Sequence, residues 1–153
     1  MKFLELKIIP PLQVLVLVVV ALLTHRYLPF FHHHVGIEPW TAIALMAIAA
    51  LMLFTAVFQF YKHKTTINPV KVNDAQTLMT SGVYAYSRNP IYLADLLLIA
   101  ALVIWLGQWV NLILPVIFIW YCGRFQIAPE EKALRDKFQL SYDQYLERTR
   151  RWL

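Results

Sequence analysis

The chain has 153 residues, with 14 lysines and arginines against 9 acidic residues and a formal net charge of +5. Hydrophobic residues make up 59% of it, above the roughly 45–50% of soluble domains, and they are concentrated in runs, which indicates an integral membrane protein with a single domain over residues 1–153. The basic residues flank these runs, so the charge does not indicate a nucleic-acid partner, and the lone Cys122 excludes an internal disulfide and a multi-cysteine zinc site.

The first two apolar runs, residues 8–27 and 39–61, predict transmembrane helices, because each is about the ~20 residues needed to cross the hydrocarbon core. A charged start before an apolar run is also typical of a signal peptide, but the sequence after residue 23 offers no small-residue cleavage site. Between the runs lies His32-His33-His34. Consecutive histidines point in different directions, so we interpret them as an interfacial loop and predict no metal site.

Residues 90–106 and 109–124 predict two shorter spans, joined by a tight turn at Gly107-Gln108. Pro90 suits the first turn of a helix, and Pro115 is expected to kink the last span. From Pro129 onward the pattern predicts a separate amphipathic helix, whose inner face recurs at helical spacing: Glu131, Leu134, Phe138, Tyr142 and Tyr145. We therefore expect an all-α, polytopic membrane protein with four transmembrane helices and a C-terminal amphipathic cytoplasmic helix.

The basic residues also predict a topology. If the N-terminus, the 62–90 loop and the C-terminal tail share one side, that side holds thirteen lysines and arginines, and the opposite side holds Arg26. This is a strong positive-inside asymmetry, so both termini are predicted to be cytoplasmic.

Two polar stretches then fall on the same side of the membrane. The stretch from Gly82 to Tyr92 gathers an arginine, an asparagine and tyrosines at a helix N-terminus, which favours negative charge, and Glu130-Glu131 follows the last apolar run. Asp95 lies one turn beyond Tyr92. An acid inside a span is costly and therefore suggests function. A base, a contact to an acceptor, or a structural pair with a hydroxyl of the bundle are the open roles.

Three segments together resemble a known family: Thr80-Ser81-Gly82-Val83-Tyr84, then Arg88-Asn89-Pro90-Ile91-Tyr92, then Glu130-Glu131 after a helical hairpin. The chain is similar to the integral-membrane methyltransferases, which contain isoprenylcysteine carboxyl methyltransferases and phospholipid N-methyltransferases. The resemblance covers about residues 66–153 and extends to Arg151-Trp152. Two positions depart from it. Asn89 replaces the family histidine and cannot take up a proton near neutral pH, and Gln139 replaces the glycine after Phe138.

The resemblance implies an S-adenosylmethionine site within residues 80–153 and methyl transfer to a lipophilic acceptor, either a small molecule, a lipidated substrate or a membrane lipid. Carboxyl O-methylation of the isoprenylcysteine type is the closest implication. The residue types suit this cofactor, since Arg88 would meet its carboxylate, the Glu130-Glu131 pair its amine and hydroxyls, and tyrosine faces its sulfonium. The candidate cofactor-binding residues are Gly82, Tyr84, Arg88, Asn89, Pro90, Tyr92, Glu130, Glu131, Tyr142 and Tyr145, and the candidate catalytic residues are Arg88, Asp95 and Glu131.

Three other functions stay open at this stage. One is N-methylation of a phospholipid. Another is an NADPH-dependent membrane reductase of the sterol-reductase type, in which Arg124 or Arg135 would meet the 2′-phosphate. The last is a non-catalytic membrane scaffold, which the Asn89 replacement would permit.

Overall fold

The computed structural model describes residues 10–28, 39–62 and 77–153. The regular elements of these segments are all helical, apart from one isolated bridge between Ser87 and Arg150: α1 (Pro10–Tyr27), α2 (Pro39–Lys62), η4 (Gly82–Ala85), α3 (Pro90–Leu106), η5 (Trp109–Leu112), α4 (Ile113–Cys122), η6 (Gly123–Ile127) and α5 (Ala128–Arg148). The predicted all-helical architecture is confirmed. The expectations for the charged N-terminal start, for His32-His33-His34 and for residues 65–76 lie outside the described residues.

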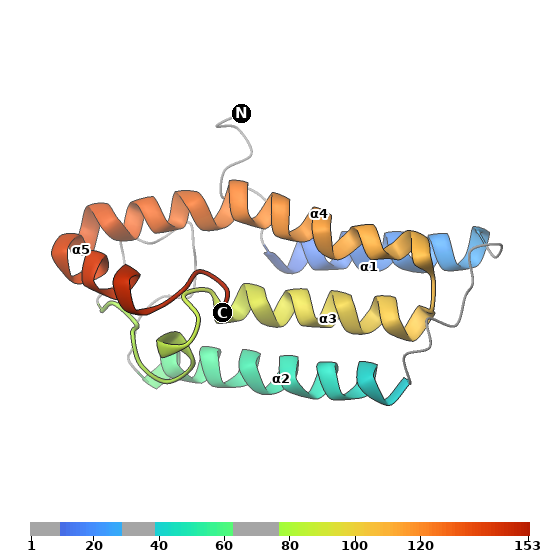
Figure 1. The fold of residues 1–153 in the computed structure, drawn as a ribbon, viewed down its shortest axis with the longest axis horizontal. Coiled ribbons are helices and arrows are strands. Elements are labelled where there is room, and N and C mark those ends of the chain that lie inside the picture. Colours follow the sequence, from blue (N-terminus) through green and yellow to red (C-terminus); the bar gives the residue numbers. More distant parts are fainter. Residues whose placement is uncertain (1–9, 29–38, 63–76) are drawn as a thin grey trace.

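The helices form an elongated bundle with α3 at its centre (Figure 1). Helix α2 packs along one side of α3, and α1 and α4 pack along the other. Ala42, Ala49 and Ala56, one every seven residues, are fully buried on α2. Small residues at this spacing let two helix backbones approach closely, which explains the extensive α2–α3 contact.

The outer surface of the bundle is apolar. Leu15, Phe54 and Trp120 each expose more than half of their area. Three helical stretches among the described residues are long and apolar enough to cross a membrane, namely Pro10–Tyr27, Pro39–Lys62 and the continuous Trp109–Arg148, while α3 is apolar but shorter. This surface suits lipid, and a count of four spans stays a prediction.

Helix α3 begins and ends where its sequence signals place it. Asn89 is its N-cap and Pro90 its first residue. At the other end Gly107 adopts the left-handed conformation (φ 63°), and its N–H donates to the carbonyls of Val103 and Ile104. Glycine reaches this conformation without the steric cost of a Cβ, so the helix stops there.

The C-terminal helix differs from the expectation. Pro129 does not begin a separate helix, because the chain is already helical from Ile113 and stays so past the proline as far as Phe138 (Figure 1). A π turn at Gly123–Ile127 lies directly before the proline. In a π turn each N–H bonds to the carbonyl five residues back, which shifts the hydrogen-bond register of the helix. Pro129 has no N–H and would crowd the preceding turn of a regular α-helix, so this shift lets the helix accommodate the proline.

The predicted stripe on this helix is also corrected. Gln139 has φ 43° and ψ −119°, which breaks the helix in two. Tyr142 and Tyr145 therefore do not continue the face of Glu131 and Phe138. They lie on a returning segment that brings the C-terminus back beside the start of α3 (Figure 1).

Candidate active site

The stretch before α3 is held by α2. Gly82 has φ 60°, and a Cβ added to it would lie 2.0 Å from the Gln59 side-chain amide. With its amide turned to suit both neighbours, Gln59 donates to the Ser81 carbonyl at 2.8 Å and accepts from the Val83 N–H at 3.2 Å. Glycine is required at position 82, because both the left-handed backbone conformation and the contact with Gln59 disfavour a side chain there.

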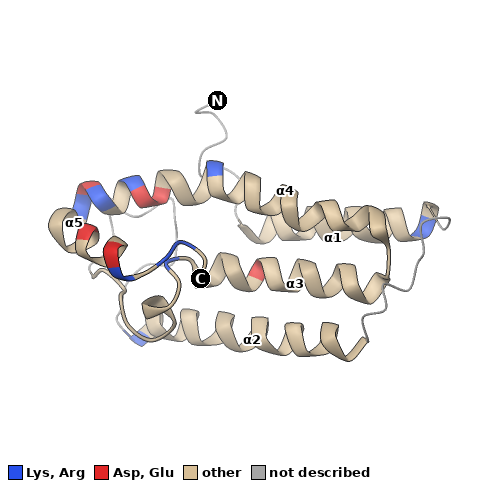
Figure 2. Cartoon of the chain, in the orientation of Figure 1, with Lys and Arg blue, Asp and Glu red and all other residues tan. Residues whose placement is uncertain are grey.

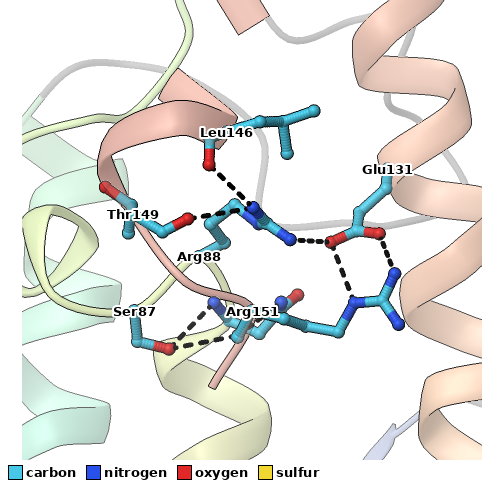
Figure 3. Close-up of polar contacts among 7 residues, drawn as sticks. Ser87, Arg88, Glu131, Leu146, Thr149 and Arg151 are labelled. Atoms are coloured by element: carbon cyan, nitrogen blue, oxygen red, sulfur yellow. Dashed lines mark hydrogen bonds and ion pairs between the residues drawn. The ribbon is translucent and has the colours of Figure 1, made fainter. Parts of the chain in front are cut away.

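Arg88 and Glu131 form the centre of a polar cluster (Figure 3). Nη2 of Arg88 donates to Oε1 of Glu131 at 3.1 Å, and Nη1 donates to the Thr149 carbonyl at 2.9 Å. The same carboxylate accepts two bonds from Arg151, at 3.2 Å from Nε and 2.5 Å from Nη2. Glu131 thus joins two arginines and ties α5 to the start of α3 and to the tail, while a cofactor contact of Glu131 stays a prediction.

The tail runs beside the stretch that precedes α3. The Arg88 N–H donates to the Arg150 carbonyl at 3.0 Å, and the Asn89 side-chain amide donates to the Arg151 carbonyl at 2.9 Å. The Tyr145 hydroxyl donates to the Tyr84 carbonyl at 2.6 Å. Asn89, which is 7% exposed, therefore uses its amide to hold the tail.

A cavity of about 600 Å³ lies between α1, α2, the start of α3 and the start of α5. Seven of the predicted site residues line it: Tyr84, Arg88, Asn89, Pro90, Tyr92, Asp95 and Glu130. Gly82, Glu131, Tyr142 and Tyr145 are not among its lining residues, and the two tyrosines are buried in the returning segment. The structure therefore brings together most of the predicted set around one space.

The apolar walls of this cavity do not follow from the sequence; they are Pro10, Pro11 and Val14 of α1, Leu53, Val57 and Phe60 of α2, and Ile91 of α3. These residues look like any others in an apolar span, so no local signal distinguishes them. Arg151 as a partner of Glu131 was also missed, although Arg151-Trp152 already stood out as part of the motif.

The cavity changes in character with depth. Charged residues gather at the end of the bundle that holds α5 and the start of α3 (Figure 2). Arg88 and Asn89 directly precede α3, and Glu130 is in the first turn of α5. Asp95 lies five residues into α3, about 7.5 Å beyond Pro90 along the helix axis. Leu53 also lines the cavity, and it lies well before the end of α2 that packs against the stretch preceding α3. The cavity is thus polar at its shallow end and apolar at its deep end, with one carboxyl among the apolar groups.

Burial controls the ionisation of the groups around the shallow end. Glu130 lies past Arg124, beyond the apolar stretch of its helix, and it accepts a bond from the Tyr92 hydroxyl at 3.0 Å. Desolvation raises the pKa of the Glu130 carboxyl to about 7, the nearby Glu131 adds to this, and the Tyr92 bond opposes it. Burial likewise raises the pKa of the Tyr84, Tyr142 and Tyr145 phenols, so these remain protonated.

Comparisons with known proteins point to one family. A model of the phospholipid methyltransferase family matches residues 37–141. A protein-S-isoprenylcysteine O-methyltransferase of Schizosaccharomyces pombe is 28% identical over 105 residues, which is 69% of this chain and 44% of that protein. The chain thus spans less than half of the length of that enzyme. An uncharacterised Haemophilus influenzae protein is 41% identical over 63 residues, which is 41% of this chain and all of that protein. No solved structure matches the chain.

Proposed function

The chain belongs to the phospholipid methyltransferase family, and on this premise we propose that it transfers a methyl group from S-adenosylmethionine to a lipophilic acceptor in the membrane. The observation that carries the proposal is the cavity itself. It joins the polar motif residues Arg88, Asn89 and Glu130 to apolar walls of two membrane helices. A charged cofactor and an apolar acceptor need these two environments next to each other.

The groups at the shallow end fit S-adenosylmethionine. Nε of Arg88 is buried and has no hydrogen-bond partner in the described chain, so the cavity wall holds a cationic donor suited to the carboxylate of the cofactor. Glu130 offers a carboxylate to an amine or a ribose hydroxyl. The rings of Tyr84 and Tyr92 line the same space and would attract a sulfonium.

When bound, S-adenosylmethionine supplies a methyl group on a sulfonium, whose C–S bond breaks with its electron pair staying on sulfur as the acceptor's lone pair takes the methyl. The chain then has to position the acceptor and exclude water. The walls formed by Val14, Leu53 and Val57 desolvate the reacting groups, and holding both partners in one cavity replaces a bimolecular encounter. No proton transfer is assigned to Asn89.

The family admits carboxyl and amine acceptors. The fission yeast relative is named as an isoprenylcysteine O-methyltransferase, whereas the family model is named for phospholipid methyltransferases. The sequence resemblance favours the carboxyl type. We also propose that the charged end of the bundle in Figure 2 faces the cytoplasm, with both termini on that side.

An NADPH-dependent reductase is less well supported. Among the described residues that line the cavity, Arg88 is the single basic one. Arg124 lies over the Phe125 ring, and Arg135 is paired with Asp143 at 2.8 Å, so neither is placed to meet a 2′-phosphate there.

The test is calorimetric binding of S-adenosylmethionine to detergent-purified protein. We expect the wild type to bind and both Arg88→Ala and Glu130→Gln to lose at least tenfold in affinity. Arg135→Ala removes an arginine from an exposed pair on α5 and serves as the matched control, with unchanged affinity. A wild type that binds NADPH and no S-adenosylmethionine would refute the proposal.

A further inference from the structure

A second cavity, of about 410 Å³, lies between the returning segment of α5 and the stretch that precedes α3, two parts of the chain that run close together (Figure 1). Its volume falls within the ~300–1,000 Å³ of pockets that bind small ligands. It shares no lining residue with the cavity proposed for methyl transfer. Six of its eight lining side chains are polar, and the whole set is Leu78, Thr80, Ala85, Ser141, Gln144, Tyr145, Arg148 and Thr149.

Hydrogen bonds hold the two walls of this second cavity together. The Tyr145 hydroxyl donates to the Tyr84 carbonyl at 2.6 Å, and the Thr149 hydroxyl donates to the Ala85 carbonyl at 3.3 Å. Tyr145 and Thr149 are both buried, so the bonds they make are shielded from water. The two walls are therefore fixed relative to each other, and the cavity is formed before any ligand binds.

Arg148 and three neutral side chains of the second cavity have no partner within the described chain. The ion pairs between described residues use other arginines, and Arg148 is in none of them. Thr80, Ser141 and Gln144 line the cavity and are exposed, and their side chains make no hydrogen bond to another described residue. Each of the four carries at least one hydrogen-bond donor, so the cavity offers donors on both walls.

The helical spacing of the returning segment keeps its acidic residues out of the second cavity. The lining residues of this helix are three or four positions apart and so share one face: Ser141, Gln144, Tyr145 and Arg148. Asp143 and Glu147 fall on the opposite face, and Asp143 is already paired with Arg135 at 2.8 Å. Among the described lining residues Arg148 is the single charged one. The second cavity is therefore cationic and favours an anion.

The donor set suits a phosphate group. A guanidinium binds phosphate through two parallel N–H bonds, and hydroxyl and amide donors can serve the oxygens that remain. The stretch that forms one wall also lies at the end of α2, because Gln59 donates to the Ser81 carbonyl and α2 ends at Lys62. Since α2 is long and apolar enough to cross a membrane, this wall lies where the chain leaves the hydrocarbon core and where lipid head groups begin.

We propose that the second cavity binds the phosphate group of a membrane phospholipid. Arg148 supplies the charge, and the Thr80 and Ser141 hydroxyls donate to the phosphate oxygens from the two walls. No bond is made or broken there, so the lipid is a bound ligand of the protein. This site is separate from the candidate active site and does not rest on the proposed methyl transfer.

The test compares three probes by calorimetry on the full chain in one detergent: dioctanoylphosphatidylglycerol, dioctanoylglycerol and inorganic phosphate. Phosphatidylglycerol carries neither an amine nor a carboxyl, so it is not an acceptor of either kind that the family admits. We expect the wild type to bind it at least tenfold more tightly than dioctanoylglycerol, which has the same tails and no phosphate. Inorganic phosphate should bind more weakly than the lipid, because it gains nothing from the apolar surface next to the site.

Two variants locate the binding. Arg148→Ala removes the charge, and Ser141→Asp places an acid on the same face, so each should lower the affinity for phosphatidylglycerol at least tenfold. Both positions are exposed, so both variants are expected to fold, which their thermal midpoints will check. Arg150→Ala is the matched control, because Arg150 is exposed and does not line the second cavity, and it should bind like the wild type.

An affinity within twofold of wild type in Arg148→Ala or Ser141→Asp would overturn the proposal, as would an equal loss in Arg150→Ala. Dioctanoylglycerol binding as tightly as phosphatidylglycerol would show that the tails alone are bound. Inorganic phosphate binding as tightly as the lipid would refute the assignment to a membrane lipid. None of these results depends on S-adenosylmethionine, so failure of this site and failure of the proposed function can be told apart.

Discussion

Replacing Glu131 by alanine should destabilise the protein far more than removing its exposed partner Arg151 would. The Arg88–Glu131 pair is largely buried, with 14% and 16% of the two side chains exposed, whereas Arg151 is 44% exposed. Removing one partner of a buried pair leaves the other charge uncompensated, at about 3 kcal/mol. The Arg151 contact is partly solvated, and its loss should cost about 0.5–1 kcal/mol. We therefore expect Glu131→Ala to cost about 3 kcal/mol and Arg151→Ala less than a third of that.

The assay is reversible unfolding in mixed detergent micelles, with helicity as the signal, for both single variants and the double variant. Because Glu131 joins both arginines, the two losses should not add, and the double variant should be little worse than Glu131→Ala alone. Equal small losses in both single variants would show that the pair is solvated, and the account of Glu131 as the tie between α5, α3 and the tail would be wrong.

Three further predictions concern single positions. Gln139→Gly should stabilise the protein by about 1 kcal/mol in the same unfolding assay, because glycine adopts φ 43° without strain. Gly82→Ala should cost at least about 2 kcal/mol, since it adds strain at φ 60° and a contact with Gln59, whereas Gly123→Ala, with open space around its Cβ position, is the matched control. Because the pKa of Glu130 is raised in the folded state from 4.5 to about 7, folded protein holds a proton that unfolded protein has lost, so the thermal midpoint should fall as pH rises through this range and stay flat in Glu130→Gln.

Local sequence signals predict the helices and the bounds of α3, but they do not predict the break within α5. Pro90 and Gly107 act through their own backbone preferences, so the bounds of α3 follow from the sequence alone. The break at Gln139 does not follow in this way, because glutamine has no preference for positive φ and takes it only where the returning segment packs. The departure from the family glycine at that position was the signal available for it.

The candidate site could also be predicted only in part. The motif residues could be recognised, and seven of them do line one cavity. Their partners could not be predicted, because the bond from Arg151 to Glu131 joins residues on either side of a helix break that the helical spacing hides. The apolar walls depend on which face of α1 and α2 turns toward α3, and helices that are apolar all round give no indication of that face.

Asn89 and Asp95 both bear on where a proton released in the cavity could go. Asn89 cannot take up a proton, and its amide is already committed to the Arg151 carbonyl. Two carboxyls line the cavity among the residues that the structure describes, those of Asp95 and Glu130, and Glu130 is engaged by the Tyr92 hydroxyl. If the reaction releases a proton, Asp95 is therefore the group in contact with the acceptor space that is free to receive it. If the reaction releases none, the chain has kept an uncompensated acid inside a membrane helix at a cost that nothing else in the described structure offsets.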